Sequence, residues 1–370
     1  MHKKLTIQDI ARLAGVSKAT VSRVLNRNPS VAADLSERVM RVVQEHDFVP
    51  NITATGLAGG RTRLVGVLAP PLTWPAVPEI MRGVAEYIEK TQYEIVLYSV
   101  SYSFDGNHSD VLDGILAMRM VSGLLAIFPG NLFPHLTTRF HEGLPLVMID
   151  DQQRPANVPW VGVDNVASAY EATKHLLDLG YRRIAHMRGP QHYCCAMERY
   201  QGYCQALQDA GISPDPALLF QGSFDTPSGR QCAEDLFALD KSAWPEAIFV
   251  SNDQMAYGVL EVAEARGVRV PEELALVGFD DNILSTHMRP PLTTIRQPFF
   301  EMGSKAIEIL LTMIDPDHRA AEAQRKGNAL LGPDGTLGDA GTDQPVHIQL
   351  PTSLVVRASS GAPRTLSISP

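Results

Sequence analysis

The residues between positions 18 and 23 combine the side-chain types that contact a DNA duplex. Within a short predicted helix, the outward positions carry a lysine, a small residue, two residues with hydroxyl groups and an arginine, namely Lys18, Ala19, Thr20, Ser22 and Arg23. Lysine and arginine bond base edges in the major groove, and a helix with small outward residues can approach them closely. The solvated face of a small helical hairpin would use the same residue types, so this alternative stays open for these residues alone.

These residues need a scaffold that holds the helix outward, and the flanking sequence predicts one. Thr6 and Asp9 have the spacing of a helix-capping box, Gly15 supplies the positive φ of a sharp turn, and Ser17 caps the second helix. The apolar spacing predicts an inward face made of Ile7, Ile10, Ala11 and Ala14 in the first helix and Val21, Val24 and Leu25 in the second. A third helical run over 35–46 would complete the unit by burying Val39, Val42 and Val43.

Two stretches of this region, VSKATVSRVLN and FVPNITATGLA, resemble the lactose/galactose repressor (LacI/GalR) family of bacterial transcription factors. The resemblance extends from about residue 4 to about residue 359. It implies a homodimer that binds a pseudo-palindromic operator, with Lys18, Ala19 and Arg23 at the positions that read bases. The full DNA-binding set that it implies is Thr6, Ser17, Lys18, Ala19, Thr20, Ser22, Arg23, Asn26, Asn51 and Leu57.

Residues 50–60 are expected to form a hinge helix and linker that order only on DNA. The run from 52 to 57 is shorter than the ~12 residues that an isolated helix needs in water. By resemblance, Leu57 of each copy enters the minor groove at the operator centre. Thr55 and Gly56 depart from the family pattern, and both lower helix propensity. We therefore expect residues 50–58 to be frayed without DNA, with a plain linker as the alternative.

The charge of the chain is divided between a basic N-terminal segment and an acidic remainder. Residues 1–63 hold ten Lys or Arg and five Asp or Glu, so they carry +5. The net charge of the chain is −9, so the remainder carries −14. This division is expected of a DNA-binding domain joined to a regulatory domain. The four cysteines lack metal-ligand spacing and are expected to be free thiols in a reducing cytoplasm.

From residue 61 onward, the sequence predicts an α/β body of two doubly wound parallel-sheet lobes, similar to the periplasmic binding proteins. Continuous apolar strands separated by helices indicate parallel sheets covered on both faces. The first series of predicted strands is 64–69, 94–100, 122–128 and 144–150, and the second is 160–164, 182–189, 246–253 and 275–281. Two such series place a cleft between two lobes.

The predicted division of the chain is a head over 1–49, the hinge and linker over 50–60, and an effector-binding and dimerisation domain over 61–360. Lobe one is expected to span about 61–160 and 293–320, and lobe two about 161–292 and 346–360. In this division the strand at 292–298 crosses back to lobe one. Residues 316–346 are rich in Gly, Ala and Asp without an apolar period, which predicts a mobile insertion. The tail, 361–370, lacks leucine heptads.

Ligand contacts are expected where strands end, because doubly wound sheets bind ligands at their carboxyl edges. Asp150, Asn252 and Asp280 end or follow three strands, and Arg199 opens a helix after a fourth. A carboxylate and a forked guanidinium suit the neighbouring hydroxyls of a sugar. Each residue also has a structural alternative, because strand-end Asp and Asn residues cap helices and Arg199 could be an ordinary surface residue.

The family resemblance adds aromatic walls to this set and an expectation about the ligand. The implied effector-binding residues are Trp74, Phe128, Asp150, Tyr193, Arg199, Phe224, Asn252, Asp280 and Gln297. Purine-responsive relatives carry an additional Arg shortly after the Gly-Pro at 189–190, where this chain has Tyr193. We therefore expect a repressor of carbohydrate-utilisation genes that a sugar effector releases from its operator. A purine, a phosphosugar or a corepressor remains the alternative, and Trp74 could instead be a core residue.

Two other classes of protein could use a two-lobe α/β body. An enzyme would need a phosphate-binding or metal motif, and the sequence has no GxGxxG after a strand, no GxxxxGKS/T and no HExxH. A periplasmic sugar-binding protein would need an export signal in place of the helix-turn-helix. We expect a cytoplasmic regulator with no catalytic residues, no cofactor, no metal and no membrane span.

Overall fold

A computed structural model describes residues 5–25, 31–46, 48, 62–100, 113–114, 120–129, 132–149, 157–315, 318 and 346–361. The chain divides into two compact units, a head that includes Met1–Thr62 and a body that begins at Arg63. Several expectations lie outside the described residues: those for Asn26, Asn51, Leu57 and Asp150, for the hinge, and for nearly all of the insertion at 316–346.

The head is a three-helix unit, and its apolar spacing explains why. Its helices are α1 (Ile7–Leu13), α2 (Lys18–Leu25) and α3 (Ala33–Glu45). They pack around a small core in which Ile10, Val21 and Val39 are fully buried. The remaining inward residues that the sequence predicts are buried or half-buried in the same core.

The turns of the head follow from its capping residues. The backbone N–H of Thr6 donates to the Asp9 carboxylate at 2.9 Å, and the N–H of Asp9 donates to Thr6 Oγ1 at 3.3 Å, which closes the capping box. Gly15 has φ +64°, the left-handed conformation that a side chain disfavours. The N–H of Thr20 donates to Ser17 Oγ at 3.1 Å, so Ser17 caps α2 as predicted.

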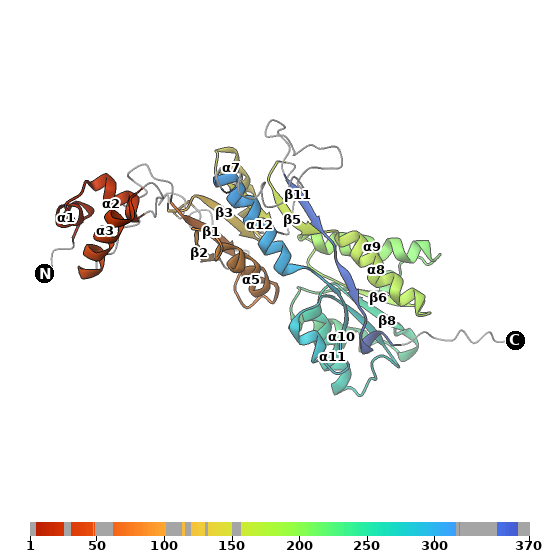
Figure 1. Cartoon of the computed structure of the whole chain (residues 1–370). Helices are drawn as coiled ribbons and strands as arrows, with labels where there is room; N and C mark the ends of the chain where they lie inside the picture. Colours follow the sequence, from red (N-terminus) through yellow and green to blue (C-terminus); the bar gives the residue numbers. More distant parts are fainter. Residues whose placement is uncertain are drawn as a thin grey trace. The chain divides into compact units, whose positions relative to one another are not determined.

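The first lobe of the body is a six-stranded sheet of order β11-β5-β4-β3-β1-β2, and all its pairs are parallel (Figure 1). Its strands are β1 (Leu64–Ala69), β2 (Glu94–Ser99), β3 (Gly123–Ile127), β4 (Leu146–Ile149), β5 (Trp160–Val163) and β11 (His347–Leu350). Successive side chains along each strand point to opposite faces of the sheet. Val65 and Val67 join the core with α5 (Ala76–Ile88) and α12 (Phe299–Ile314), whereas Leu68 joins the core with α7 (Phe133–His141).

The second lobe repeats this plan with the order β12-β10-β9-β8-β6-β7, in which only β12 is antiparallel to its neighbour. Its strands are β6 (Ile184–Arg188), β7 (Leu219–Gln221), β8 (Ala247–Val250), β9 (Ala275–Asp280), β10 (Thr293–Arg296) and β12 (Ser353–Val355). Its α-helices are α8 (Asn165–Asp178), α9 (Cys194–Asp209), α10 (Thr226–Phe237) and α11 (Asp253–Ala265). Helices α8 and α9 cover one face of the sheet, and α10 and α11 cover the other (Figure 1).

The segments that pass between the lobes differ from the sequence prediction in two places. The predicted placement of 160–164 in the second lobe is wrong, because β5 pairs with β4 and β11 of the first sheet. The predicted crossing at 292–298 is also displaced, because β10 pairs with β9 and β12 of the second sheet. In both cases the chain leaves its lobe only after the strand, so the local sequence shows that a strand exists but not which sheet it joins.

Strand β11 is a further difference, because the sequence prediction assigns residues 346–360 to the second lobe alone. Its side chains alternate between exposed and half-buried at the edge of the first sheet, so it lacks the continuous apolar run of an inner strand. The chain then crosses at 351–352 to β12, where Thr352 Oγ1 and Ser168 Oγ are 2.8 Å apart. Among the described residues, no helix has both the length and the hydropathy needed to cross a membrane.

Candidate effector cleft and DNA-reading helix

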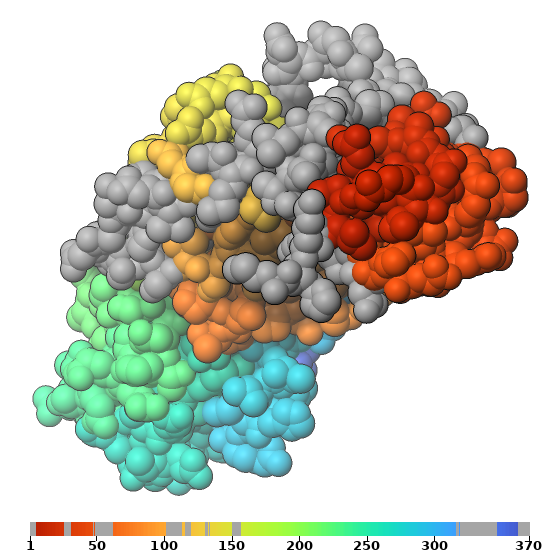
Figure 2. Space-filling model, turned by 90° about the vertical axis from the view of Figure 1, so that its left-hand side faces the viewer, coloured from red at the N-terminus to blue at the C-terminus, as the bar shows by residue number. Residues whose placement is uncertain are grey.

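A cavity of about 350 Å³ lies between the two lobes, within the size range of small-molecule sites. Eight of the nine predicted effector-binding residues line it: Trp74, Phe128, Tyr193, Arg199, Phe224, Asn252, Asp280 and Gln297. Most of them follow or end a strand, as expected for the carboxyl edges of the two sheets, whereas Arg199 lies within α9, the helix after β6. Figure 2 views a face on which residues of lobe one, in orange, meet green and cyan residues of lobe two.

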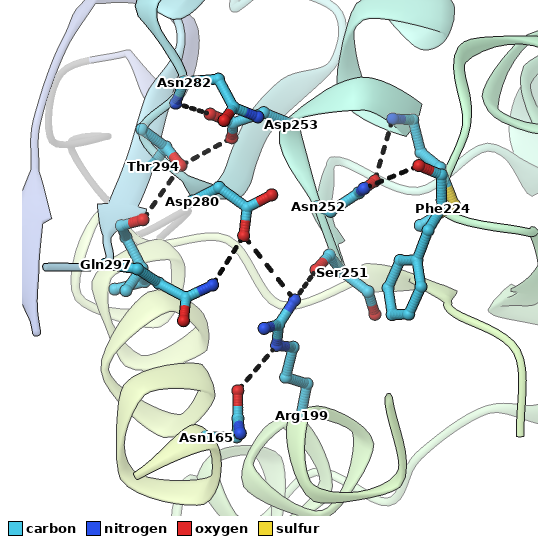
Figure 3. A network of polar contacts seen from close by, with 12 residues as sticks. Asn165, Arg199, Phe224, Ser251, Asn252, Asp253, Asp280, Asn282, Thr294 and Gln297 are labelled. Carbon is cyan, nitrogen blue, oxygen red and sulfur yellow. Dashed lines mark hydrogen bonds and ion pairs between the residues drawn. The ribbon is translucent and has the colours of Figure 1, made fainter. Parts of the chain in front are cut away.

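Arg199 forms the cationic part of the cleft, and it is not an ordinary surface residue because only 3% of it is exposed. Its Nε donates to Asn165 Oδ1 at 2.9 Å and its Nη1 donates to the carbonyl of Ser251 at 2.6 Å (Figure 3). The guanidinium also lies over the ring of Phe279, with Cζ 3.7 Å from the ring centroid. These contacts fix the direction of the guanidinium before any ligand arrives.

Asp280 and Gln297 form the acceptor side of the same polar wall (Figure 3). One oxygen of Asp280 lies 4.0 Å from Arg199 Nη1 and accepts a hydrogen bond from Gln297 Nε2 at 2.8 Å. Gln297 is 6% exposed, and its Oε1 has no hydrogen-bond partner among the described residues. A buried amide oxygen without a donor is costly, so a ligand that supplies a donor would be stabilised there.

Aromatic rings from both lobes complete the cleft. Trp74 and Phe128 of the first lobe have ring centroids 6.4 Å apart, and Tyr193 and Phe224 of the second lobe have centroids 5.8 Å apart. Trp74 is 37% exposed, so the alternative that it is a core residue is wrong. Phe224 fits because the neighbouring Gly189 has no side chain; a Cβ there would lie 2.1 Å from the Phe224 ring.

Three residues of the cleft have left-handed backbone conformations that are rare outside glycine. The φ angles of Phe128, Phe224 and Asp280 are +47°, +66° and +124°. Such conformations cost on the order of 1–3 kcal/mol each and cluster at ligand-binding sites. The surrounding structure must therefore hold these three residues in place.

The strand-end pair Asn252-Asp253 has roles that the sequence only partly predicts. Asn252 caps α11, since its Oδ1 accepts from the N–H of Met255 at 3.0 Å, and its Nδ2 donates to the carbonyl of Phe224 at 2.9 Å. Asp253, the next residue, is not the cap of this helix. Asp253 is fully buried and accepts hydrogen bonds from the loop after β9 and from β10.

Sequence reasoning did not identify several residues of the cleft. Asn165 holds Arg199 and in turn donates through Nδ2 to Glu198 at 3.1 Å. The position of Asn165 just after the end of β5 could have identified it as a cleft residue, but the sequence prediction assigns that strand to the wrong lobe. The unpredicted lining residues are Thr73, Pro75, Ala76, Cys194, Cys195, Ser223, Asp225, Gln254 and Phe299. The four cysteines form no disulfide, and the described residues contain no cluster suited to a metal ion.

In the head, helix α2 presents the side chains that the sequence assigns to DNA contact. Lys18, Ala19 and Arg23 are exposed, whereas Thr20 and Ser22 are half-buried. Val21 and Val24, on the opposite face of the helix, are buried in the head core. A short helix held in this way by its apolar face suits the major groove.

Comparison with known proteins agrees with both the three-helix head and the two-lobe body. Residues 6–51 match the family of bacterial regulatory proteins described as the lacI family, and residues 173–330 match a periplasmic binding protein-like domain. The HTH-type transcriptional regulator DegA of Bacillus subtilis (strain 168) is 34% identical over 307 residues, which are 82% of this chain and 89% of DegA.

Two solved structures cover nearly the whole chain. The transcriptional regulator CelR in complex with cellobiose is 31% identical with a TM-score of 0.67, covering 96% of this chain and 99% of CelR. The lac repressor dimer bound to operator and the anti-inducer ONPF is 28% identical with a TM-score of 0.79, covering 97% of this chain and 100% of the other.

The DNA-binding head and the two-lobe body with its cleft define a ligand-responsive class of transcription regulator. The chain belongs to the LacI family of bacterial regulatory proteins.

Proposed function

We propose that this protein represses carbohydrate-utilisation genes and leaves its operator when a sugar occupies the interlobe cleft. The observation that carries the proposal is the polar wall of Arg199, Asp280 and Gln297 inside a cavity lined by aromatic rings. Sugar hydroxyls donate to the carboxylate and to the open amide oxygen, and their oxygens accept from the guanidinium. The C–H faces of the sugar pack on the rings.

The head supplies the DNA contact in this proposal. Lys18, Ala19 and Arg23 read base edges, while Thr6, Ser17, Thr20, Ser22 and Asn26 position the head on phosphates. Two copies bind the two halves of a pseudo-palindrome. Support for a homodimer comes from the 3-10 helix Ile283–Thr286, where Ile283 and Leu284 are 82% and 52% exposed. Neighbouring apolar side chains so exposed are typical of an interaction surface. The cytoplasm is the compartment in which such a regulator acts.

Coupling between cleft and head would pass through the crossing segments. Arg199 is hydrogen-bonded to Asn165, which directly follows the segment that crosses between the lobes after β5. Gln297 lies in the segment that crosses back between β10 and α12. A ligand that contacts Arg199, Asp280 and Gln297 therefore contacts side chains tied to the segments that set the angle between the lobes. An effector that prefers the lobe angle unfavourable for ordered hinges shifts the population off DNA.

A thermal-shift measurement on the full chain tests the sugar assignment. Neutral sugars, hypoxanthine and glucose 6-phosphate are compared for their effect on the melting temperature of the wild type, which a bound ligand raises by mass action. Asp280→Asn should lose the rise, and the exposed control Asp235→Asn should keep it. A rise with hypoxanthine or glucose 6-phosphate, without one for any neutral sugar, would reject the sugar proposal.

A further inference from the structure

We propose that the cleft binds a neutral disaccharide, with one ring at the polar wall of lobe two and the second ring on Trp74 and Phe128 of lobe one. This inference rests on the proposed sugar response and adds the charge of the ligand, its number of rings and its orientation. It is carried by the charge balance of the cleft and by the separation of its aromatic residues into two pairs.

The charges in the cleft disfavour an anionic ligand. Among the described lining residues, the charged side chains are Arg199, Asp225 and Asp280, one cation and two carboxylates. The cation is already engaged by the Ser251 carbonyl and Asn165 and lies beside Asp280. A phosphate would therefore meet a compensated guanidinium and two like charges, with no second cation from these residues. A neutral polyol suits this balance because its hydroxyls both donate and accept.

The second-lobe aromatic pair belongs to the polar wall. The Phe224 ring centroid is 5.9 Å from Arg199 Cζ, and the Phe224 carbonyl accepts from Asn252. Tyr193 lies at the start of α9, the helix that carries Arg199, and burial raises the pKa of its hydroxyl, which keeps it neutral. One sugar ring whose hydroxyls contact Arg199, Asp280 and Gln297 is thus bounded by Phe224 and Tyr193.

The first-lobe pair offers a separate stacking surface. Trp74 precedes α5 and Phe128 directly follows β3, so both come from the sheet across the cleft, and their rings are inclined by 33° to each other. Trp74 remains 37% exposed beside the cavity, a large apolar surface that a ligand would cover. A single pyranose at the polar wall satisfies the hydrogen-bonding groups there, and a second ring accounts for the exposed Trp74 beside the half-buried Phe128.

The test compares disaccharides with their own monosaccharides. Titration calorimetry on the full-length protein uses cellobiose, maltose and lactose against glucose and galactose, with glucose 6-phosphate and hypoxanthine as the charged and the aromatic probes. At least one disaccharide should bind at least about tenfold more tightly than either of its monosaccharides, because the second ring buries additional apolar surface. Trp74→Ala should weaken disaccharide binding about tenfold and leave monosaccharide binding unchanged. The control Leu72→Ala, at an exposed residue outside the cavity lining, should change neither.

Alkylation of the lining residues Cys194 and Cys195 reports whether the probe occupies this cleft. A bound disaccharide should slow their alkylation, and the reaction of Cys232, which is buried outside the cleft, should not change. Equal affinity for a disaccharide and its monosaccharide would overturn the two-ring inference and leave the sugar proposal standing. Binding of glucose 6-phosphate or hypoxanthine alone would overturn both. Failure of all three disaccharides to bind, or disaccharide binding that is unaffected by Trp74→Ala, would also overturn the inference.

Discussion

Asp253 holds the loop that presents Asp280 to the cleft, and two substitutions separate its hydrogen bonding from its charge. One carboxylate oxygen accepts from the backbone N–H of Asn282 at 2.9 Å and from Ser285 Oγ at 2.6 Å, and the other accepts from Thr294 Oγ1 at 2.7 Å. These bonds join the start of α11 to the loop after β9 and to β10. We therefore expect Asp253 to contribute to stability and, through the loop, to ligand affinity.

Asp253→Ala should lower the free energy of unfolding by about 3–5 kcal/mol, because a buried N–H and two hydroxyls lose their acceptor. Part of this loss is recoverable, since Ser285 Oγ also lies 2.8 Å from Tyr257 Oη. Asp253→Asn should cost only about 1 kcal/mol, because its oxygen can still accept from Asn282 and Ser285. Its amide can donate to Thr294, whose hydroxyl can in turn donate to the Ile295 carbonyl at 3.4 Å.

The charge of Asp253 adds a dependence on pH. Burial, and then the nearby charge of Asp280, raises the pKa of Asp253 from 3.8 to about 8. Between these values the folded protein binds a proton that the unfolded chain does not, so the contribution of this carboxyl to stability falls as pH rises from about 4 to about 8. Asp253→Asn should remove that component.

Urea unfolding of the full-length protein at several pH values measures both effects, and ligand titration measures the loop. A body midpoint for Asp253→Ala equal to that of the wild type would refute the hydrogen-bonding argument. An unchanged pH dependence in Asp253→Asn would refute the assignment of the titration to this residue. Exposed Asp235→Asn serves as the control for loss of a carboxylate without burial.

Three further substitutions test the head and the cleft. Lys18→Ala should weaken binding to a selected operator by about 1–3 kcal/mol and spare random DNA, whereas equal losses in electrophoretic mobility shifts would make Lys18 a phosphate contact only. Arg199→Ala should raise the sugar concentration needed for DNA release. It should also lower the free energy of unfolding by about 2–4 kcal/mol, because Arg199 is buried and hydrogen-bonded. Unchanged sugar affinity in calorimetry would reject the site. Gly189→Ala should displace Phe224 and abolish sugar binding while operator affinity stays normal, so retained sugar binding would count against Phe224 as a wall.

The sequence predicts the order of helices and strands well, because local patterns determine them. The capping box of Thr6 and the φ of Gly15 depend on near neighbours, and both are confirmed. Asn252 and Asp280 could be placed at the cleft because carboxyl ends of parallel strands share one edge of each sheet. Trp74, Phe224 and Gln297 could be placed there only through the family resemblance. Their roles as ligand contacts stay predictions.

Other features depend on partners distant in the sequence and could not be predicted. Asn252 and Asp253 are adjacent acceptors after the same strand, yet one lines the cleft and the other is enclosed by residues that lie 29 to 41 positions later. Similarly, the lobe to which β5 and β10 belong is set by the strands with which they pair, and the local sequence of each strand does not specify its partners.

In the proposed mechanism, occupancy of the cleft controls binding of the head to DNA. The most direct measurement uses a fluorescent duplex selected by the full-length protein from a random pool, with anisotropy recorded against protein concentration with and without the disaccharide that binds most tightly. A saturating disaccharide should raise the Kd for the selected duplex by roughly tenfold or more, within the usual range of allosteric coupling. The Kd should not change in Asp280→Asn, which is expected not to bind the sugar. An unchanged or lower Kd in the wild type, with calorimetry showing the disaccharide bound and slowed alkylation of Cys194 and Cys195 showing the cleft occupied, would contradict this control of DNA binding.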